Sequence, residues 1–355
     1  MNTFGNRFRV SIFGESHGPL VGVTIDGVLP GMPLSEEDFT QDLARRKAGA
    51  KGTTPRKESD IPEIVSGVFD GHTTGAPLTI LFRNENTRSE DYEQFRKNPR
   101  PGHADFTANI KFGGFNDIRG GGHFSGRLTL GVVAAGVVAK KMLHFARFHA
   151  QLVSVGGSTD PSAWSGLLDA AAADGDSLGG VVECTVEGLP VGLGEPFWDS
   201  MESLVAHAIF AIPGVRGVEF GDGFAAAAMR GSEHNDPFPE HQCCHGEGES
   251  HHGEGECHHD QEQGHECHCH GEHEEGEEHH CCGRHRHIQP PVTNHAGGVN
   301  GGITNGNPLV LRVAFKPTAS IAKAGIPGRH DVCFALRTPV IVEAMTAIVL
   351  TDLAL

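Results

Sequence analysis

The chain has 355 residues, of which 38% are apolar and 21% are charged, and its formal net charge at pH 7 is −17. These values are ordinary for a globular protein that buries a sizeable core. No run of about 18 apolar residues is free of polar residues, and the N-terminus lacks the apolar segment of a signal peptide. We therefore expect a cytoplasmic protein whose partners include neither a membrane nor a nucleic acid.

The first predicted element is a strand that ends in polar residues. Within residues 7–27, Phe8, Val10 and Ile12 alternate as in a β-strand, and the sequence Gly-Glu-Ser-His-Gly follows at residues 14–18. Ser16 and His17 thus stand between glycines, which is a common place for catalysis. A lone histidine, however, more often has a structural hydrogen-bonding role.

A basic segment, RRKAGAKGTTPRKESD, occupies residues 45–60. Its glycine, threonine and proline content favours a loop over a helix. Such a segment is either a solvated loop or a clamp for an anionic ligand, and its arginines Arg45, Arg46 and Arg56 are the candidate donors.

Two further stretches combine catalytic residue types with glycines. His103 follows Pro-Gly within residues 100–107 and is expected on a turn, and three consecutive glycines occupy residues 120–122. An apolar run that is typical of a buried helix begins at residue 128. A glycine turn before a helix N-terminus suits an anion, although most of the 49 glycines of the chain must simply form turns.

Strand-like runs alternate with a few longer helical runs along the chain. This pattern predicts a mixed α+β fold rather than a strict βαβ series. The expected strands lie at 64–69, 76–82, 179–192 and 308–315, and the expected helices at 35–47, 128–148, 198–211 and 338–355.

Residues 241–287 differ in composition from the rest of the chain. They hold 14 of the 24 histidines, seven of the nine cysteines, and 12 acidic residues against two arginines. Almost nothing here is apolar, so we expect a segment that is disordered without a ligand. No zinc-finger spacing is present, but the supply of thiolates and imidazoles favours binding of zinc or nickel. The alternative is a tolerated low-complexity loop; the densest ligand cluster is Cys267, His268, Cys269 and His270.

Eleven motifs, in this order, resemble those of the chorismate synthase family and cover all of the chain except residues 241 to about 290. They are FGESHG (13–18), RKESD (56–60), RSEDY (88–92), RPGHADFT (100–107), RGGGHFSGRLT (119–129), GLGEPFWD (192–199), GVEFGDGF (217–224), RGSEHND (230–236), TNHAGGVNGGITNG (293–306), KPTASI (316–321) and GRHDVC (328–333).

The resemblance implies a single-domain β-α-β sandwich that forms a homotetramer. The domain would comprise residues 1–240 and 291–355, interrupted by an insert at 241–290. The implied enzyme is a carbon–oxygen lyase that acts on phosphates. It would convert 5-enolpyruvylshikimate 3-phosphate to chorismate by a trans-1,4-elimination, and it would require reduced FMN.

The resemblance also implies roles for individual residues. His17 would keep the flavin in its proper protonation state, and His103 would protonate the departing phosphate. Asp331 would act with the flavin in removal of the ring proton, and Ser16 and Ser125 would support proton relay.

Arg46 would contact the anionic substrate or NADPH, with Arg45 and Arg56 beside it. The expected flavin-binding residues are His123, Phe124, Ser125, Gly301, Lys316, Pro317, Thr318, Ala319, Ser320 and Arg329.

The chain departs from the commonest family pattern at three positions. Many members have arginine, serine and glutamate where this chain has His123, Phe124 and Leu128. A histidine and an aromatic ring in place of a permanent cation and a hydroxyl put flavin affinity in question.

NADPH is a possible source of reducing equivalents, and we expect an external flavin reductase as a partner. Two other functions are open. A metal-storage protein would explain only residues 241–287. A flavin oxidoreductase that uses NADPH would explain FMN and the arginines, but no GxGxxG motif opens a βαβ unit in this sequence.

Overall fold

The computed structural model describes residues 2–55, 58–85, 90–239, 289–326 and 330–355. The chain divides into two compact units, residues 1–235 with 294–355, and residues 236–293. All described helices and strands belong to the first unit. The predicted metal ligands lie outside the described residues; they are Cys267, His268, Cys269 and His270.

The first sheet has five antiparallel strands. Their order is β1 (Thr3–Phe4), β2 (Arg9–Gly14), β3 (Leu20–Asp26), β7 (Leu78–Arg83) and β4 (Glu63–Ser66). Phe8 and Val10 of the predicted alternating strand are both buried, and in the central strands β3 and β7 the paired residues Val23 and Ile80 are fully buried. The run at residues 7–27 therefore contains two strands, and the predicted polar segment connects them.

The second sheet has four antiparallel strands in the order β10 (Val215–Phe220), β13 (Leu309–Phe315), β9 (Gly180–Glu187) and β8 (Arg147–Val155). Every second residue of β9 and β13 is buried, as expected for strands with one face against the core.

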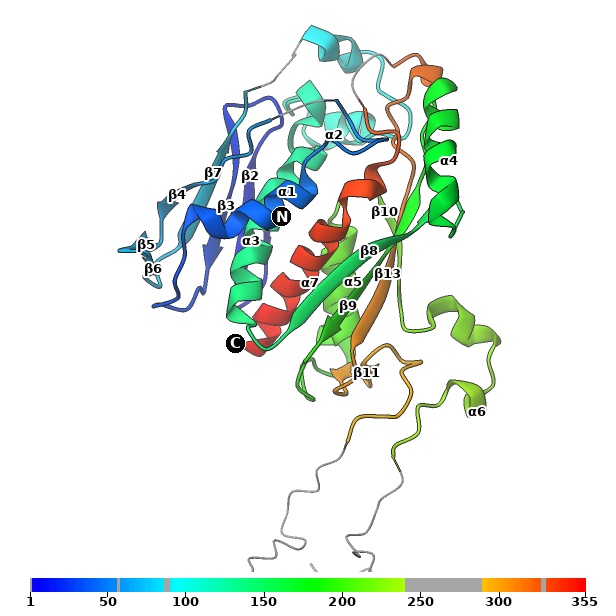
Figure 1. The fold of residues 1–355 in the computed structure, drawn as a ribbon. Helices are drawn as coiled ribbons and strands as arrows, with labels where there is room; N and C mark the ends of the chain where they lie inside the picture. The colour runs from blue at the N-terminus through cyan, green and yellow to red at the C-terminus, as the bar shows by residue number, and fades with distance from the viewer. Residues whose placement is uncertain (1, 56–57, 86–89, 240–288, 327–329) are drawn as a thin grey trace, which may run out of the picture. The chain divides into compact units, whose positions relative to one another are not determined.

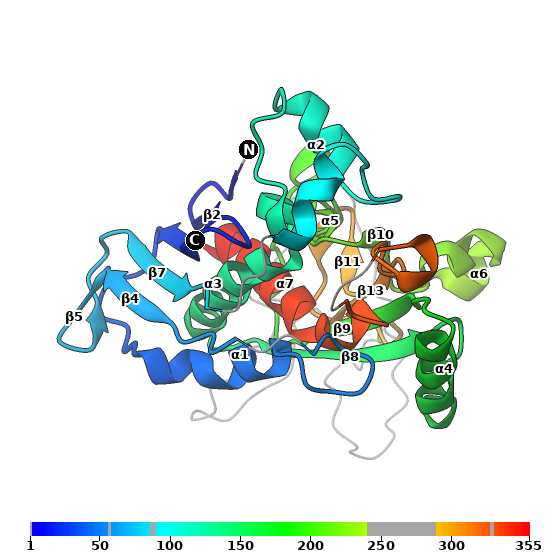
Figure 2. The same ribbon diagram turned by 90° about the horizontal axis from the view of Figure 1, so that it is seen from above.

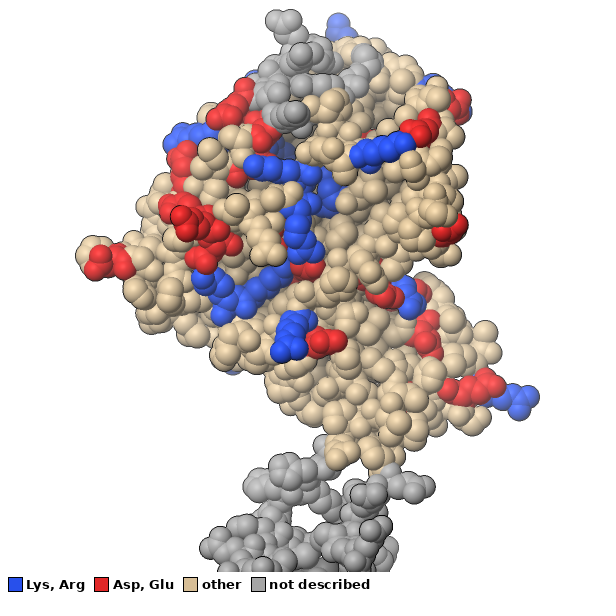
Figure 3. Space-filling view, in the orientation of Figure 1, with Lys and Arg blue, Asp and Glu red and all other residues tan. Residues whose placement is uncertain are grey.

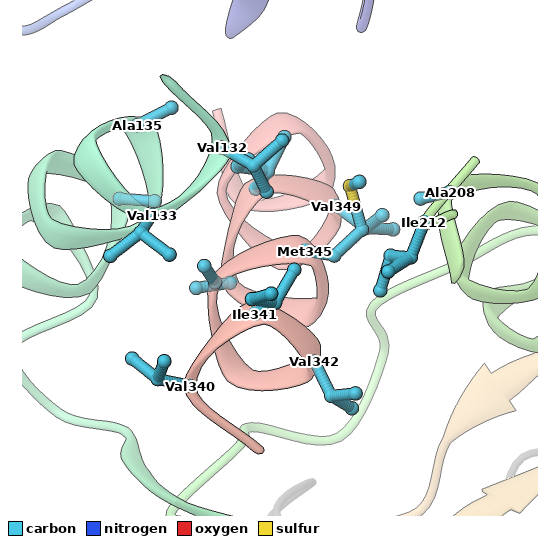
Figure 4. Close-up of a cluster of buried hydrophobic side chains, with 14 of the residues drawn as sticks. Val132, Val133, Ala135, Ala208, Ile212, Val340, Ile341, Val342, Met345 and Val349 are labelled. Carbon is cyan, nitrogen blue, oxygen red and sulfur yellow. The ribbon is translucent and has the colours of Figure 1, made fainter. Parts of the chain in front are cut away.

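Three helices lie between the two sheets: α3 (Thr129–Met142), α5 (Met201–Phe210) and α7 (Pro339–Ala354) (Figures 1 and 2). Helix α3 packs on β3, and α7 packs on β8 and β9. Where α3 meets α7, a Cβ atom on Gly136 would lie 2.3 Å from that of Ala344, so glycine permits the close approach. Figure 4 shows the apolar side chains at the junction of α7 with α3 and α5. This arrangement of sheet, helices and sheet confirms the predicted β-α-β sandwich of the α+β class.

Shorter elements connect these layers. They are η1 (Glu36–Phe39), α1 (Thr40–Arg46), β5 (Val68–Phe69), β6 (His72–Thr73), η2 (Glu90–Arg96), α2 (Asp105–Lys111), η3 (Arg119–Phe124), η4 (Gly126–Leu128), α4 (Pro161–Ala173), η5 (Phe197–Asp199), η6 (Gly223–Ala228), α6 (Gly231–His234), β11 (Val299–Asn300), β12 (Ile303–Thr304), η7 (Ala322–Ala324) and η8 (Phe334–Arg337).

Several predicted elements have different bounds in the structure; the strand expected at 179–192, for example, ends at Glu187. The helix expected at 128–148 ends at Met142, and residues from Arg147 onward form β8 because they pair with β9. The strand expected at 64–69 is divided at Gly67, whose φ of +89° a side chain would rarely adopt. Among the described residues, no helix has the length and apolar character needed to cross a membrane.

Candidate active site

The first unit encloses a cavity of about 1000 Å³, lined by segments from across the chain. Its described lining includes seven Lys and Arg residues but only three acids, so the cavity suits an anionic ligand. Lys and Arg side chains gather along the middle of the face shown in Figure 3. The seven cations of the cavity lining are Arg46, Lys47, Arg100, Arg127, Arg216, Lys316 and Arg337, and its three acids are Glu58, Asp60 and Asp331.

Part of the cavity wall is apolar. Such a wall suits a ligand that carries a flat or apolar part in addition to its charge. The apolar lining consists of Phe124, Phe210, Ile212, Pro213, Val215 and Phe334.

The glycine turn 120–122 brings the predicted catalytic residues together. All three glycines have positive φ angles, between 54° and 84°. A Cβ atom on Gly120 would lie 2.6 Å from Nε2 of His17, and one on Gly121 would lie 3.5 Å from Nε2 of His103. The close approach of the turn to His17 therefore requires a glycine at position 120, whereas a Cβ atom on Gly121 would make an ordinary contact with His103.

Ser16 and His17 follow β2 and lie behind this turn. Ser16 is fully buried, and its N–H donates to the carbonyl of Gly122 at 3.1 Å. Its Oγ is a buried polar atom without a hydrogen-bond partner among the described residues. His17 is 8% exposed, and its ring meets the edge of Tyr92 with a centroid distance of 5.1 Å.

His103 lines the cavity on the turn before α2. Its Nδ1 lies 2.7 Å from Oδ1 of Asp105, and Asp105 also accepts two side-chain hydrogen bonds from Arg100, at 2.7 and 2.8 Å. Burial would raise the pKa of Asp105, but the hydrogen bonds from Arg100 and His103 outweigh it and hold that pKa well below its usual range.

Arg46 ends α1 and is 4% exposed. Its guanidinium donates to Thr129 Oγ1 at 2.9 Å and to Asp60 Oδ2 at 3.4 Å. Burial and the nearby charge of Arg337 lower the pKa of Arg46 to about 9, although Asp60 opposes this shift. Arg46 is thus a cation whose charge a bound anion would stabilise.

Asp60 also forms an ion pair with Arg127, a second buried arginine of the cavity. Arg127 donates to Asp60 Oδ1 at 2.9 Å and to the carbonyl of Arg83 at 3.1 Å, and it contacts Asn84 Oδ1. One buried carboxylate therefore holds Arg46 and Arg127 side by side.

Asp331 is buried at the cavity, where it accepts hydrogen bonds from the N–H of Thr54 and from Nη2 of Arg337, each at 2.8 Å. The Nε atom of Arg337 is buried without a partner among the described residues. Arg337 also lies over the ring of Phe334, 5.1 Å from its centroid.

Residues 316–320 contribute five consecutive residues to the lining. Lys316 donates to the carbonyl of Gly102 at 2.6 Å, and burial together with the charge of Arg216 lowers its pKa. The hydroxyl of Thr318 is buried without a partner among the described residues, while Ser320 Oγ lies 3.4 Å from Nη1 of Arg100.

His123, Phe124 and Ser125 also line the cavity. His123 Nδ1 lies 2.8 Å from the carbonyl of Gly14, which joins this segment to the end of β2. Phe124 is 41% exposed, and Ser125 Oγ accepts from the N–H of Arg127 at 3.3 Å.

Two predicted site residues lie elsewhere. Arg45 turns away from the cavity and forms two hydrogen bonds, at 2.7 and 2.6 Å, with the buried carboxylate of Glu343. The reason is that adjacent residues of a helix project about 100° apart, and α1 extends to Arg46. Gly301 is exposed in the turn between β11 and β12 and does not line the cavity. The other two predicted contacts, Arg56 and Arg329, lie outside the described residues.

Some residues in or beside the cavity were not predicted from the sequence. Arg100 and Asp105 flank His103, and an acid two residues after a histidine was a local signal for this cluster. Asp60 gave no comparable signal, because its partner Arg127 lies 67 residues away. Arg337 gave none either, because six residues separate it from its partner Asp331.

Comparisons with known proteins identify a family for the whole chain. The family model described as chorismate synthase matches residues 8–355. A chorismate synthase of Chitinophaga pinensis is 54% identical over 370 residues, which cover 100% of this chain and 97% of the relative. One of Dehalococcoides mccartyi is 41% identical over 395 residues, covering 100% and 96%. A crystal structure of chorismate synthase superposes with a TM-score of 0.68 at 25% identity, covering 99% of this chain and 92% of the other.

Proposed function

The chain belongs to the chorismate synthase family, and we propose that the basic cavity around Arg46, His103 and Asp331 is its active site. The enzyme is a lyase of aromatic amino acid biosynthesis. It eliminates phosphate from 5-enolpyruvylshikimate 3-phosphate to form chorismate, and its family depends on reduced FMN. The observation that carries the proposal is the excess of cations over acids in the described lining of the cavity that also contains His103 and Asp331.

The lining residues fit a flavin mononucleotide together with the substrate. At about 1000 Å³ the cavity is at the upper end of the range for small-molecule sites, and it combines cations with an apolar wall. Lys316 and the unpartnered hydroxyl of Thr318 would hold polar groups of the flavin, and Phe124 would contact its ring. When bound, reduced FMN would supply electron density for cleavage of the carbon–oxygen bond.

Arg46 and Arg337 are proposed to bind the anionic groups of the substrate. Both are buried or nearly so at the cavity, and Arg337 has a buried Nε without a partner among the described residues. A phosphate or carboxylate would accept from these guanidinium groups and relieve the repulsion between them. As phosphate departs, the same donors would stabilise the charge that accumulates on its oxygens.

His103 is proposed to donate a proton to the departing phosphate. The imidazole lines the cavity and its side chain is 21% exposed, so a ligand can reach it. A positioned histidine contributes about 10²- to 10⁴-fold to such a proton transfer.

Asp331 and the pair formed by Ser16 and His17 are proposed to manage the other protons. Asp331 is held by Thr54 and Arg337, and each of its oxygens keeps a lone pair for the ligand. Ser16 Oγ is buried beside the glycine turn and can both donate and accept, which is what a relay requires. Ser125 is proposed to support the same relay from the cavity side.

The assembly and supply of reductant are also part of the proposal. We infer a cytoplasmic homotetramer that obtains reduced flavin from an external, NADPH-using reductase, as the family motifs imply. Residues 241–290 are proposed as an insert that binds zinc or nickel through its cysteines and histidines.

Anaerobic formation of chorismate with dithionite-reduced FMN tests the assignment of the cavity. We expect Asp331→Asn to lose most of its turnover. The control Arg312→Ala removes an arginine that pairs with Glu183 at 2.9 Å and does not line the cavity, and it should retain turnover. Equal activity of the two variants would contradict the assignment.

A further inference from the structure

The pair formed by His103 and Asp105 determines where the proton of the imidazole lies. His103 Nδ1 and Asp105 Oδ1 are 2.7 Å apart, and the side chain of Asp105 is only 4% exposed. Two hydrogen-bond acceptors at this distance would repel each other, so one of the two atoms must carry a proton.

The contacts of Arg100 indicate which of these two atoms carries the proton. Its Nε and backbone N–H donate to Asp105 Oδ2 at 2.7 and 3.1 Å, and its Nη2 donates to Oδ1 at 2.8 Å. The guanidinium is itself buried against the ring of Phe95, 4.8 Å from the centroid. A carboxylate that accepts this many hydrogen bonds from a cation stays ionised, so the shared proton belongs to Nδ1 of His103.

The contact between Arg100 and His103 is consistent with this arrangement. Nη2 of Arg100 lies 3.2 Å from Nδ1, which is longer than its 2.8 Å bond to Asp105 Oδ1. A guanidinium can only donate, so Nη2 of Arg100 donates to Asp105 Oδ1 and cannot accept a hydrogen bond from Nδ1–H of His103. The Nδ1–H group therefore donates to the same carboxylate oxygen.

With Nδ1 committed to Asp105, Nε2 is the nitrogen available to a ligand. The ring lies against Gly121, where a Cβ atom would stand 3.5 Å from both Nε2 and Cε1. We propose that Asp105, held by Arg100, is a positioning residue that fixes His103 as the Nδ1-protonated tautomer and so makes Nε2 the atom that exchanges protons with the substrate. This inference rests on the role proposed above for His103.

The variant Asp105→Asn tests the inference because an amide has only one accepting atom. Two donors of Arg100, Nε and the backbone N–H, face the Oδ2 position. We expect the amide oxygen to take that position, so that its NH₂ group faces His103 and favours the Nε2-protonated tautomer. We expect kcat to fall by about 10²- to 10⁴-fold while KM changes by less than about threefold.

The tautomer can be measured directly. Nitrogen NMR spectra of enzyme labelled with ¹⁵N-histidine, with His103 assigned by its loss in His103→Gln, should show a protonated Nδ1 in the wild-type enzyme. The same signals in Asp105→Asn should shift to a protonated Nε2. A wild-type enzyme in which Nε2 carries the proton would overturn the inference even if the Asp105 variant does not fold.

A matched control is offered by Asp222, which lies 2.7 Å from Nδ1 of His295 and does not line the cavity. Asp222→Asn should leave the His103 signals and kcat unchanged. If His103→Gln retains turnover, the proposed role of His103 fails. If His103→Gln is inactive and Asp105→Asn keeps both turnover and the Nδ1 proton, only the positioning role of Asp105 fails.

Discussion

Gly120 lies so close to His17 that a Cβ atom on Gly120 would stand 2.6 Å from Nε2 of the imidazole. The backbone of Gly120 also has a φ of +60°, which L-residues with side chains rarely adopt. The position of His17 is therefore set by the absence of a side chain on the turn.

The variant Gly120→Ala should displace His17 and reduce turnover at least tenfold. The strained backbone should also lower the free energy of unfolding by about 1–3 kcal/mol. Anaerobic turnover and urea unfolding measure the two effects. Gly166→Ala in α4, where a Cβ meets nothing within 4 Å, is the control. It should keep wild-type turnover and should raise the free energy of unfolding by about 0.5–1 kcal/mol, because alanine favours a helix interior over glycine.

The adjacent residues Arg45 and Arg46 should respond differently to the same substitution. Arg46→Lys keeps the charge but loses the planar fork, so we expect kcat/KM to fall by about 10- to 100-fold. Arg45→Lys should leave kcat/KM within about threefold, because Arg45 binds Glu343 outside the cavity. Equal losses of kcat/KM in the two variants would contradict this prediction, because they would show that both substitutions act by disturbing helix α1.

Glu343 should make stability depend on pH. Burial would raise its pKa, but Arg45 and Lys140 together lower it. A carboxyl group with a depressed pKa contributes stability above its unfolded pKa of about 4.3 and loses that contribution as the pH falls through the folded value.

We therefore expect Glu343→Gln to reduce the free energy of unfolding by about 1–3 kcal/mol at pH 7. The difference from the wild-type enzyme should shrink as the pH falls below about 4. Urea unfolding at a series of pH values measures it. A difference that grows toward acid pH would contradict the sign of the shift.

Deletion of residues 241–287 should leave the elimination reaction intact. The chain before the segment, at Asp236 and Pro237, lies next to the chain after it, at Val292 and Thr293. Val292 N–H donates to the carbonyl of Pro237 at 2.8 Å, and the Thr293 hydroxyl donates to Asp236 at 2.6 Å. A short linker can therefore close the gap. Zinc binding, measured by calorimetry, should disappear with the deletion, and loss of turnover in the shortened enzyme would instead assign the segment to the active site.

The sequence predicted those parts of the site whose signals are local. The glycines beside His17 and His103 marked both turns, and the segment from Lys316 to Ser320 was found through its motif and lines the cavity. The same holds for the alternation in the first sheet, where Phe8 and Val10 are both buried, since one face of a sheet leaves a period of two in the sequence.

Features that depend on distant contacts could not be predicted. The helix expected at 35–47 includes both Arg45 and Arg46, but nothing in its sequence indicated that Arg45 would bind Glu343, 298 residues away. Asp60 is another example, because its role depends on Arg127, 67 residues away. Such pairs are determined by the packing of the layers rather than by local spacing.

The central claim is that the cavity containing His103 is the site of the elimination. Its most direct test is anaerobic release of phosphate from 5-enolpyruvylshikimate 3-phosphate with dithionite-reduced FMN, measured for the wild-type enzyme and for His103→Gln. We predict release by the wild-type enzyme and a loss of about 10²- to 10⁴-fold in kcat for the variant, with flavin still bound. Phosphate release at the wild-type rate by His103→Gln would contradict the account.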